Sequence, residues 1–399
     1  MKISTRLSTD AWLLLASYSL NTIFNLFMMT FFISFIMHNA VNEIVSVSLY
    51  NIFYYAVSTI FLFLVVTGWV KRKNNVTILR LSALPKILCL LVIIFLSDSV
   101  VHYVALMGVM FGVIDTMFWA PTQILTAEKV PPTVMTKFMG YRSTLGGITK
   151  IAAPFLLGLF ITLGSFEEVA KALLAFAFLE FILPLFMRPH RPAAGKGPDF
   201  RGFLRCMINT PGLRRWLRVE VLSGMALEGI VGVIITMYTV YMFKTDFMLG
   251  LLTTIFSLVA VIAMFLFGRF GSRAMFPKLL VSATIVTVGG FGLFVIDQSL
   301  TSFLIFNFVA VTATALLGKI TVINGYNMSQ SGCVAGESRA EYFAFRAAAH
   351  GIGSSISFGG LLLIGVFGGY EWLRWYLLPL ALVIILICRR LVKYNPQFQ

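Results

Sequence analysis

Charged residues are scarce in this chain of 399 residues, of which only 12% are Asp, Glu, Lys or Arg. Soluble domains usually carry about 25%, whereas 59% of this sequence is hydrophobic and its mean hydropathy is +0.90. Several apolar runs reach the roughly 18–20 residues that span a bilayer. The composition therefore excludes an ordinary soluble domain, and the short connectors leave no segment for a separate soluble catalytic domain.

Cysteine and histidine are also rare, with four of each. The cysteines are widely separated, with no CxxC pair and no histidine at ligand spacing, so neither a metal site nor a redox pair is indicated. Because most of them fall on the expected cytoplasmic side, we expect no disulfide. The chain also lacks GxSxG, Walker and HExxH motifs. We therefore expect a protein that is not an enzyme and needs no cofactor or metal.

Positive charge is the exception, since the net charge is +15. In a soluble protein such an excess would favour nucleic-acid binding. Here the basic residues lie in alternate loops, which is the positive-inside pattern of membrane proteins. We therefore expect no nucleic-acid partner, and a multi-pass protein of the bacterial cytoplasmic (inner) membrane with both termini in the cytoplasm.

The apolar runs predict an all-α integral membrane protein with about 12 transmembrane helices. We expect two pseudo-symmetric six-helix bundles, at residues 1–187 and 219–399, joined by a basic cytoplasmic linker at 188–218. Part of this linker is predicted to lie as an amphipathic helix against anionic headgroups. The alternative is a solvated basic connector.

The two halves repeat each other at an offset of about 204 residues. At this offset Arg142 matches Arg346, and Gly147 matches Gly351, whereas Asp115 falls on Lys319. Opposite charges at equivalent points of membrane-depth helices indicate a two-lobed transporter.

Two six-span halves, the basic linker, and short basic loops after spans two and eight resemble the major facilitator superfamily. The first loop has Gly68 and a basic cluster at 71–73, without the acidic residue and second glycine that are typical of the family. Ala153-Pro154 in span five is loosely similar to the signature of its exporters. The resemblance implies that spans one, four, seven and ten line a central cavity, and that the two halves rock to give alternating access.

Basic residues near the cytoplasmic ends of the spans are expected to support a gate. Arg142 and Arg346, at the starts of spans five and eleven, would act through backbone carbonyls or acids such as Glu341. The other expected gating or structural residues belong to the two basic loops: Lys71, Arg72, Arg269 and Arg273.

Ionisable side chains inside the membrane cost about 2.5–3.5 kcal/mol each on insertion scales, so each requires a partner or a function. Asp115 and Lys319 are candidate cavity residues that meet substrate or each other, the alternative being a static ion pair. Glu228 in span seven is a candidate site for a proton or a cationic substrate, the alternative being a neutral structural Glu. Polar residues that bind solute or only join helices are Asn21, Asn25, Asn51, Tyr55 and Asn307.

The sequence therefore predicts a secondary active transporter that moves a small organic or amphipathic solute. We expect proton coupling through Asp115 or Glu228, with export (efflux) slightly favoured over import. The expected partners are the solute, protons and membrane lipids, and we expect a monomer. A lipid or glycolipid flippase on the same scaffold, or a non-transporting membrane receptor, are the alternatives.

Overall fold

The computed structural model describes residues 7–65, 74–130, 132–189, 199–270, 275–328 and 339–394, and within these helices it leaves out the side chains of Glu228 and a few others. The described residues form helices joined by short turns. Two short segments are 3-10 helices and one is a π-helix. The fold is therefore all-helical in this part of the chain, as the sequence predicts.

The first half contains a series of long helices and three short irregular segments. Its elements are α1 (Thr9–Leu26), η1 (Phe27–Phe31), α2 (Phe32–Asn39), α3 (Glu43–Val65), α4 (Asn75–Leu81), α5 (Ala83–Leu96), η3 (Ser97–Tyr103), α6 (Val104–Lys129), α7 (Pro132–Leu163), α8 (Phe166–Ile182) and η4 (Leu183–Phe186).

The second half follows a short helix, α9 (Phe200–Asn209), that lies in the expected linker. Its elements are α10 (Pro211–Ala226), α11 (Glu228–Phe243), α12 (Asp246–Phe270), α13 (Phe276–Ile296), α14 (Leu300–Met328), α15 (Arg339–Phe367), α16 (Gly369–Trp375) and α17 (Leu377–Tyr394).

Eleven helical stretches among the described residues are long and apolar enough to cross a bilayer. One of them, Asn75–Thr126, has 52 residues, far more than the roughly 20 of one crossing. The segment η3 divides it into two arms, α4–α5 and α6, which pack against each other. Together these stretches give the twelve crossings that the sequence predicts.

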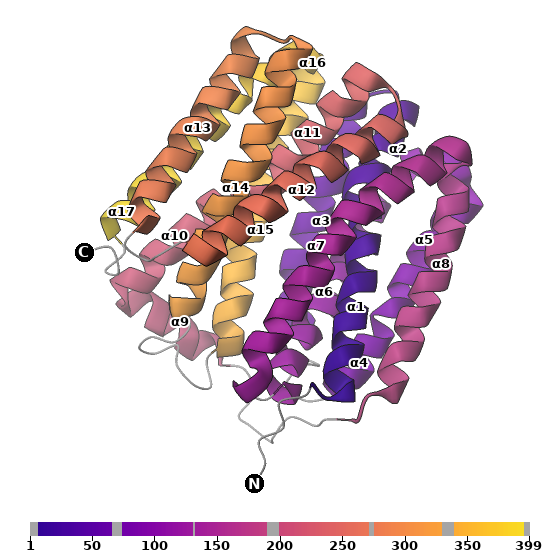
Figure 1. Cartoon of the computed structure of the whole chain (residues 1–399), viewed down its shortest axis with the longest axis vertical. Helices are drawn as coiled ribbons and strands as arrows, with labels where there is room; N and C mark the ends of the chain where they lie inside the picture. The colour runs from indigo at the N-terminus through magenta and orange to yellow at the C-terminus, as the bar shows by residue number, and fades with distance from the viewer. Residues whose placement is uncertain are drawn as a thin grey trace.

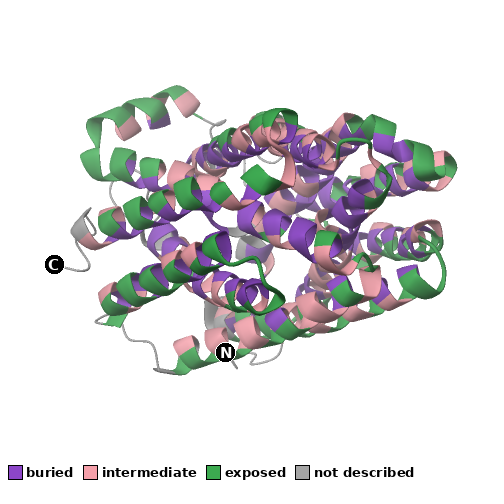
Figure 2. Cartoon of the chain, turned by 90° about the horizontal axis from the view of Figure 1, so that it is seen from above, coloured by how far each residue is buried: buried purple, intermediate pink, exposed green. Residues whose placement is uncertain are grey.

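The outer faces of the helices carry large apolar side chains. Ile60, Phe265 and Ile285 are each more than half exposed, and Figure 2 shows exposed residues along the outer faces and buried ones between the helices. Apolar surface on this scale marks an interaction with lipid or protein. A bilayer covers it in a protein with these spans.

The two halves lie side by side, the first from indigo to magenta and the second from pink through orange to yellow (Figure 1). Helix α3 packs along α15, and α7 packs along α12. At the second pair a Cβ added to Gly158 would lie 2.5 Å from the Asp246 carbonyl oxygen and 3.1 Å from Gly250 Cα. The absence of side chains at Gly158 and Gly250 therefore lets the two backbones touch.

We call the end of the bundle near α9 the linker end, and the end remote from α9 the opposite end. Polar side chains join the two halves at the opposite end. The Ser34 hydroxyl donates to Asp246 Oδ1 at 2.5 Å, and Tyr370 donates to Glu43 Oε2 at 2.7 Å. Asn42 donates to the Gly365 carbonyl at 3.2 Å. These hydrogen bonds hold the two halves together at the opposite end.

Helix α9 is amphipathic and is anchored on the second half. Phe203 is buried between Tyr342 and Phe345, whereas Leu204 and Ile208 are exposed next to arginines of the same helix. The linker thus contains the helix that the sequence predicts. Its contact with lipid headgroups stays a prediction.

The cysteines depart from expectation at one position. Cys89 and Cys388 are free and buried, but Cys206 in α9 is disulfide-bonded. The expectation of no disulfide, which rested on the expected cytoplasmic side of the cysteines, is therefore wrong for Cys206, because that side does not decide which connectors fold together. Its partner lies outside the described residues.

Candidate functional site

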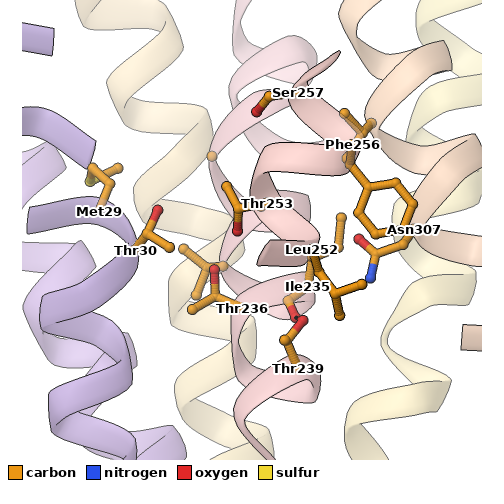
Figure 3. Close-up of a pocket in the computed structure, with 14 residues that line it drawn as sticks. Met29, Thr30, Ile235, Thr236, Thr239, Leu252, Thr253, Phe256, Ser257 and Asn307 are labelled. Atoms are coloured by element: carbon orange, nitrogen blue, oxygen red, sulfur yellow. Dashed lines mark hydrogen bonds between the residues drawn. The ribbon is translucent and has the colours of Figure 1, made fainter. Parts of the chain in front are cut away.

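A cavity of about 210 Å³ lies at the boundary between the halves. The first half contributes Met29 and Thr30 from η1, and the second half contributes residues of α11, α12 and α14 (Figure 3). Three of these elements belong to spans one, seven and ten, which the family resemblance places around a central cavity. The cavity therefore lies where a solute could contact both halves.

Both halves present an irregular helix to this cavity. Met29 and Thr30 belong to the π segment η1, and π segments are frequent at functional sites. Span seven is interrupted at Leu227, which separates α10 from α11. Gly232, about one turn later, lines the cavity. Interrupted spans are typical of transporter binding sites because they free backbone groups for a solute.

The lining is mostly apolar, with small polar side chains placed among aliphatic and aromatic ones. No Asp, Glu, Lys, Arg or His occurs among the described residues that line it. Among these described residues a charged solute would find no counter-charge, and burial of a charge without one is costly. The polar side chains are Thr30, Thr236, Thr239, Thr253, Ser257 and Asn307.

Asn307 stands out among them. It is fully buried, and neither its Oδ1 nor its Nδ2 has a hydrogen-bond partner in the protein. Figure 3 shows its amide turned towards Leu252 and Ile235, on the α11 and α12 walls. Buried polar atoms are almost always paired in folded proteins, so this amide has capacity for a ligand.

Asp115 lies in the first half and is held by polar neighbours. The Tyr54 hydroxyl donates to Asp115 Oδ2 at 3.3 Å, and Asn25 lies near the same carboxyl group. Lys319 is exposed on α14 and forms no ion pair within the described part of the chain. A static pair between Asp115 and Lys319 is therefore absent, because Asp115 is turned to its own half.

A chain of contacts connects Asp115 to the cavity. The ring of Tyr54 lies 4.5 Å from that of Tyr55 between centroids. The Tyr55 hydroxyl packs so closely on Gly229 that a Cβ there would overlap it. Gly229 lines the cavity, so the Tyr54–Tyr55 pair links the carboxylate in one half to the cavity wall in the other.

Lys86 is the buried charge whose position the sequence does not reveal. Its ammonium donates to Glu180 Oε1 and to Asn21 Oδ1, both at 2.6 Å. Lys86 Nζ lies 4.6 Å from the ring centroid of Phe118 and 5.4 Å from that of Phe24. The Lys86 side chain is fully buried. Asn21 thus accepts a hydrogen bond from a lysine of its own half, which gives its side-chain oxygen a structural role.

The two repeated arginines have unlike partners. The Arg142 guanidinium stacks on the Tyr18 ring, with Cζ 3.8 Å from its centroid. Arg346 Nε donates to Glu220 Oε1 at 2.6 Å, and its side chain packs on Gly325. The structure thus gives Arg346 an acidic partner, as expected for this residue type, although the acid is Glu220 of α10, and it places a ring against Arg142. The gating role of both arginines stays a prediction.

The remaining predicted residues divide into two groups. Asn51 is buried, and its Nδ2 donates to the Val47 carbonyl one turn earlier, so it serves its own helix. Arg269 is exposed near the end of α12. The side chain of Glu228 and the residues Lys71, Arg72 and Arg273 lie outside the description.

Sequence reasoning missed the hydroxyl residues of the cavity. Thr236 and Thr239 are three apart on α11, and Thr253 and Ser257 are four apart on α12. Each pair therefore shares a helix face, which is a signal that the sequence does carry. It does not say that the two faces meet.

Comparison with known proteins agrees with this architecture. The sequence matches the family description "Major Facilitator Superfamily" over residues 14–336. No curated protein matches it. A bacterial homologue of the iron transporter ferroportin, in an inward-facing state, is similar in structure at 14% identity, covering 96% of this chain and 98% of that one with a TM-score of 0.65.

Two further solved structures are alike in fold. The same kind of homologue in an outward-facing state with soaked iron has a TM-score of 0.63 at 13% identity, covering 97% of this chain and 98% of that one. A bacterial metal transporter has a TM-score of 0.61 at 15% identity, covering 98% and 100% of the two chains. At these identities the likeness concerns the fold.

Proposed function

The chain belongs to the major facilitator superfamily, and from this premise we propose that it carries a small, organic, amphipathic solute through the cavity at the boundary of its halves. It is a multi-pass membrane protein and a secondary transporter, not an enzyme. The observation that carries the proposal is the cavity lining, which combines apolar side chains with hydroxyls and one amide and has no charge among its described residues.

A divalent metal is the alternative solute, because the similar structures include metal transporters. Two observations favour the organic solute. Within the described residues no three His, Cys, Asp or Glu gather in a way that could hold a metal ion. In addition, the ammonium of Lys86 already occupies the carboxylate of Glu180, so a metal ion there would face an existing positive charge.

We also propose that transport is coupled to protons through Asp115. Its carboxylate accepts a hydrogen bond from Tyr54 inside the membrane, and the Tyr54–Tyr55 pair leads from it to Gly229. A change in the charge of Asp115 would alter its hydrogen bond with Tyr54. Through Tyr55 it would then alter the contact between the Tyr55 hydroxyl and Gly229 of the second half. Glu228 is a second candidate proton site in the same span as the cavity wall.

Alternating access would come from the units 1–187 and 219–399 rocking about the cavity, with 188–218 as their connector. The hydrogen bonds at the opposite end would break when that end opens. By the positive-inside rule the linker end, and with it both termini, would face the cytoplasm of a bacterial cell. Export is the direction we favour.

Thermal stabilisation of the purified chain in detergent tests the proposed solute class. The panel contains neutral amphipathic compounds, organic anions and cations, lipids, and the ions Fe²⁺ and Mn²⁺. A ligand at 100 times its dissociation constant adds about 2.7 kcal/mol when it binds only the folded state. Stabilisation by an organic compound supports the proposal, whereas stabilisation by Fe²⁺ or Mn²⁺ alone contradicts it.

A further inference from the structure

The Asn307 amide presents two different hydrogen-bonding functions to the cavity wall. Oδ1 is an acceptor and Nδ2 is a donor, and both lack a partner in the protein. The same helix carries Asn324, which is buried with Nδ2 unpartnered but does not line the cavity. What distinguishes Asn307 is therefore its place in the cavity wall, where both amide atoms are covered in the ligand-free structure and reach a solute when the side chain rotates.

We propose that the cavity selects an uncharged solute with an amide-type group, such as a carboxamide, lactam or urea. The N–H of that group donates to Asn307 Oδ1, and its carbonyl oxygen accepts from Asn307 Nδ2, so the two hydrogen bonds lie next to each other. The inference rests on the proposed function, because it assigns the solute class of the same cavity.

The chemistry of the other head groups supports this choice. A carboxylate only accepts and an ammonium only donates, so each leaves one of the two Asn307 atoms buried and unpaired. Either would also bring a charge into a cavity whose described lining contains none. An amide-type group is neutral and satisfies the two atoms with a separate donor and acceptor, whereas a hydroxyl, also neutral, has to serve both through one oxygen.

The surrounding side chains fit the rest of such a solute. Leu252 and Phe256 offer apolar surface next to the amide (Figure 3). The Thr239 hydroxyl already donates to the Ile235 carbonyl at 2.8 Å, so it faces a solute mainly as an acceptor. These walls suit an apolar body attached to the amide-type group.

The test uses five probes that share one ring and differ in the head group. They are benzamide, phenylurea, benzyl alcohol, benzoate and benzylamine, measured by equilibrium binding to the full-length chain in detergent at neutral pH. We expect benzamide and phenylurea to bind at least about tenfold more tightly than benzoate and benzylamine, which corresponds to about one net hydrogen bond, with benzyl alcohol between the two groups. Equal binding of the probes, preference for a charged one, or no binding at all would overturn the inference.

Variants assign the preference to Asn307. Asn307→Leu is expected to remove the preference for amides, and Asn307→Asp, which keeps only acceptors, is expected to shift it to benzylamine. Asn324→Leu is the matched control on the same helix and should keep the wild-type order. Survival of the amide preference in a folded Asn307→Leu variant would contradict the assignment, whether or not the Asp variant folds.

The same assay separates this inference from the proposed function. If the ring probes fail but another organic solute stabilises the protein, the amide selection is wrong and the organic transporter stands. If Fe²⁺ or Mn²⁺ alone binds, the proposed function itself is wrong.

Discussion

Lys86 and Glu180 form an ion pair inside the first half, with Nζ 2.6 Å from Oε1 and both side chains almost fully removed from the surface. The pair joins α5 to α8, and Asn21 brings in α1. Three helices of one half are thereby fixed to each other. The pair accordingly ties α1, α5 and α8 into one unit.

Removing one member of this pair should damage the protein more than removing both. Lys86→Met leaves the Glu180 carboxylate buried and unpaired, and loss of one partner of a buried pair costs about 3–5 kcal/mol. The double variant Lys86→Met/Glu180→Leu is expected to be close to wild type in stability. Thermal unfolding in detergent measures both, and a double variant as unstable as the single one would contradict the account.

Asp115→Asn should abolish transport driven by a pH gradient while leaving solute binding intact. The amide keeps the size of the side chain and can still accept from Tyr54, but it cannot change charge. Uptake into proteoliposomes with and without a pH gradient measures the effect. A variant that still responds fully to the gradient would remove Asp115 from the coupling.

Tyr55→Phe tests the contact chain from Asp115 to the cavity. The variant keeps the ring in contact with that of Tyr54 and removes the hydroxyl that packs on Gly229. We expect the affinity for the solute to depend less on pH in the variant than in the wild type. At any single pH, the affinities of the two proteins should differ by less than this change in pH dependence. Binding curves at several pH values are the measurement, and an unchanged pH profile would show that the coupling takes another route.

Gly158→Ala should destabilise the contact between the halves. The added methyl would meet the Asp246 carbonyl oxygen at 2.5 Å and push α7 from α12, and overpacking of this kind typically costs about 1–3 kcal/mol. Gly289→Ala in α13 is the matched control, because no atom lies within 4 Å of its added Cβ. There the gain in helix propensity, about 1 kcal/mol, should stabilise slightly. Equal effects of the two substitutions on unfolding temperature and transport would argue against the close crossing.

Asn307→Leu is expected to raise the stability of the ligand-free protein. It replaces two unpaired buried polar atoms, each costing about 1–3 kcal/mol when unsatisfied, with an apolar side chain of similar size. Transport should fall at least tenfold in the same variant. A structural asparagine would behave in the opposite way, so a variant that is less stable and still transports would contradict the binding role.

The sequence predicts the helices well and the contacts poorly. Span lengths, the linker helix and the family plan follow from hydrophobic runs and basic loops, which are local features. Lys86 shows the limit, because nothing in the sequence around it indicates which residue its ammonium meets. In the structure, Glu180, 94 residues later, holds it.

The cavity could be predicted only in part for the same reason. The sequence identifies Asn307 as a polar group in a span, and it places Thr236 and Thr239 on one face. It does not show that the π segment η1 brings Thr30 to them, or that Asp115 turns to Tyr54 and away from Lys319. These features depend on how helices far apart in sequence pack together.

The position of a bound solute tests the central claim most directly. An electron cryo-microscopy structure of the chain with the most stabilising organic compound would show it. We predict density between η1, α11, α12 and α14, with a polar group next to the Asn307 amide. Density for a metal ion, or for the compound away from this cavity, would contradict the account.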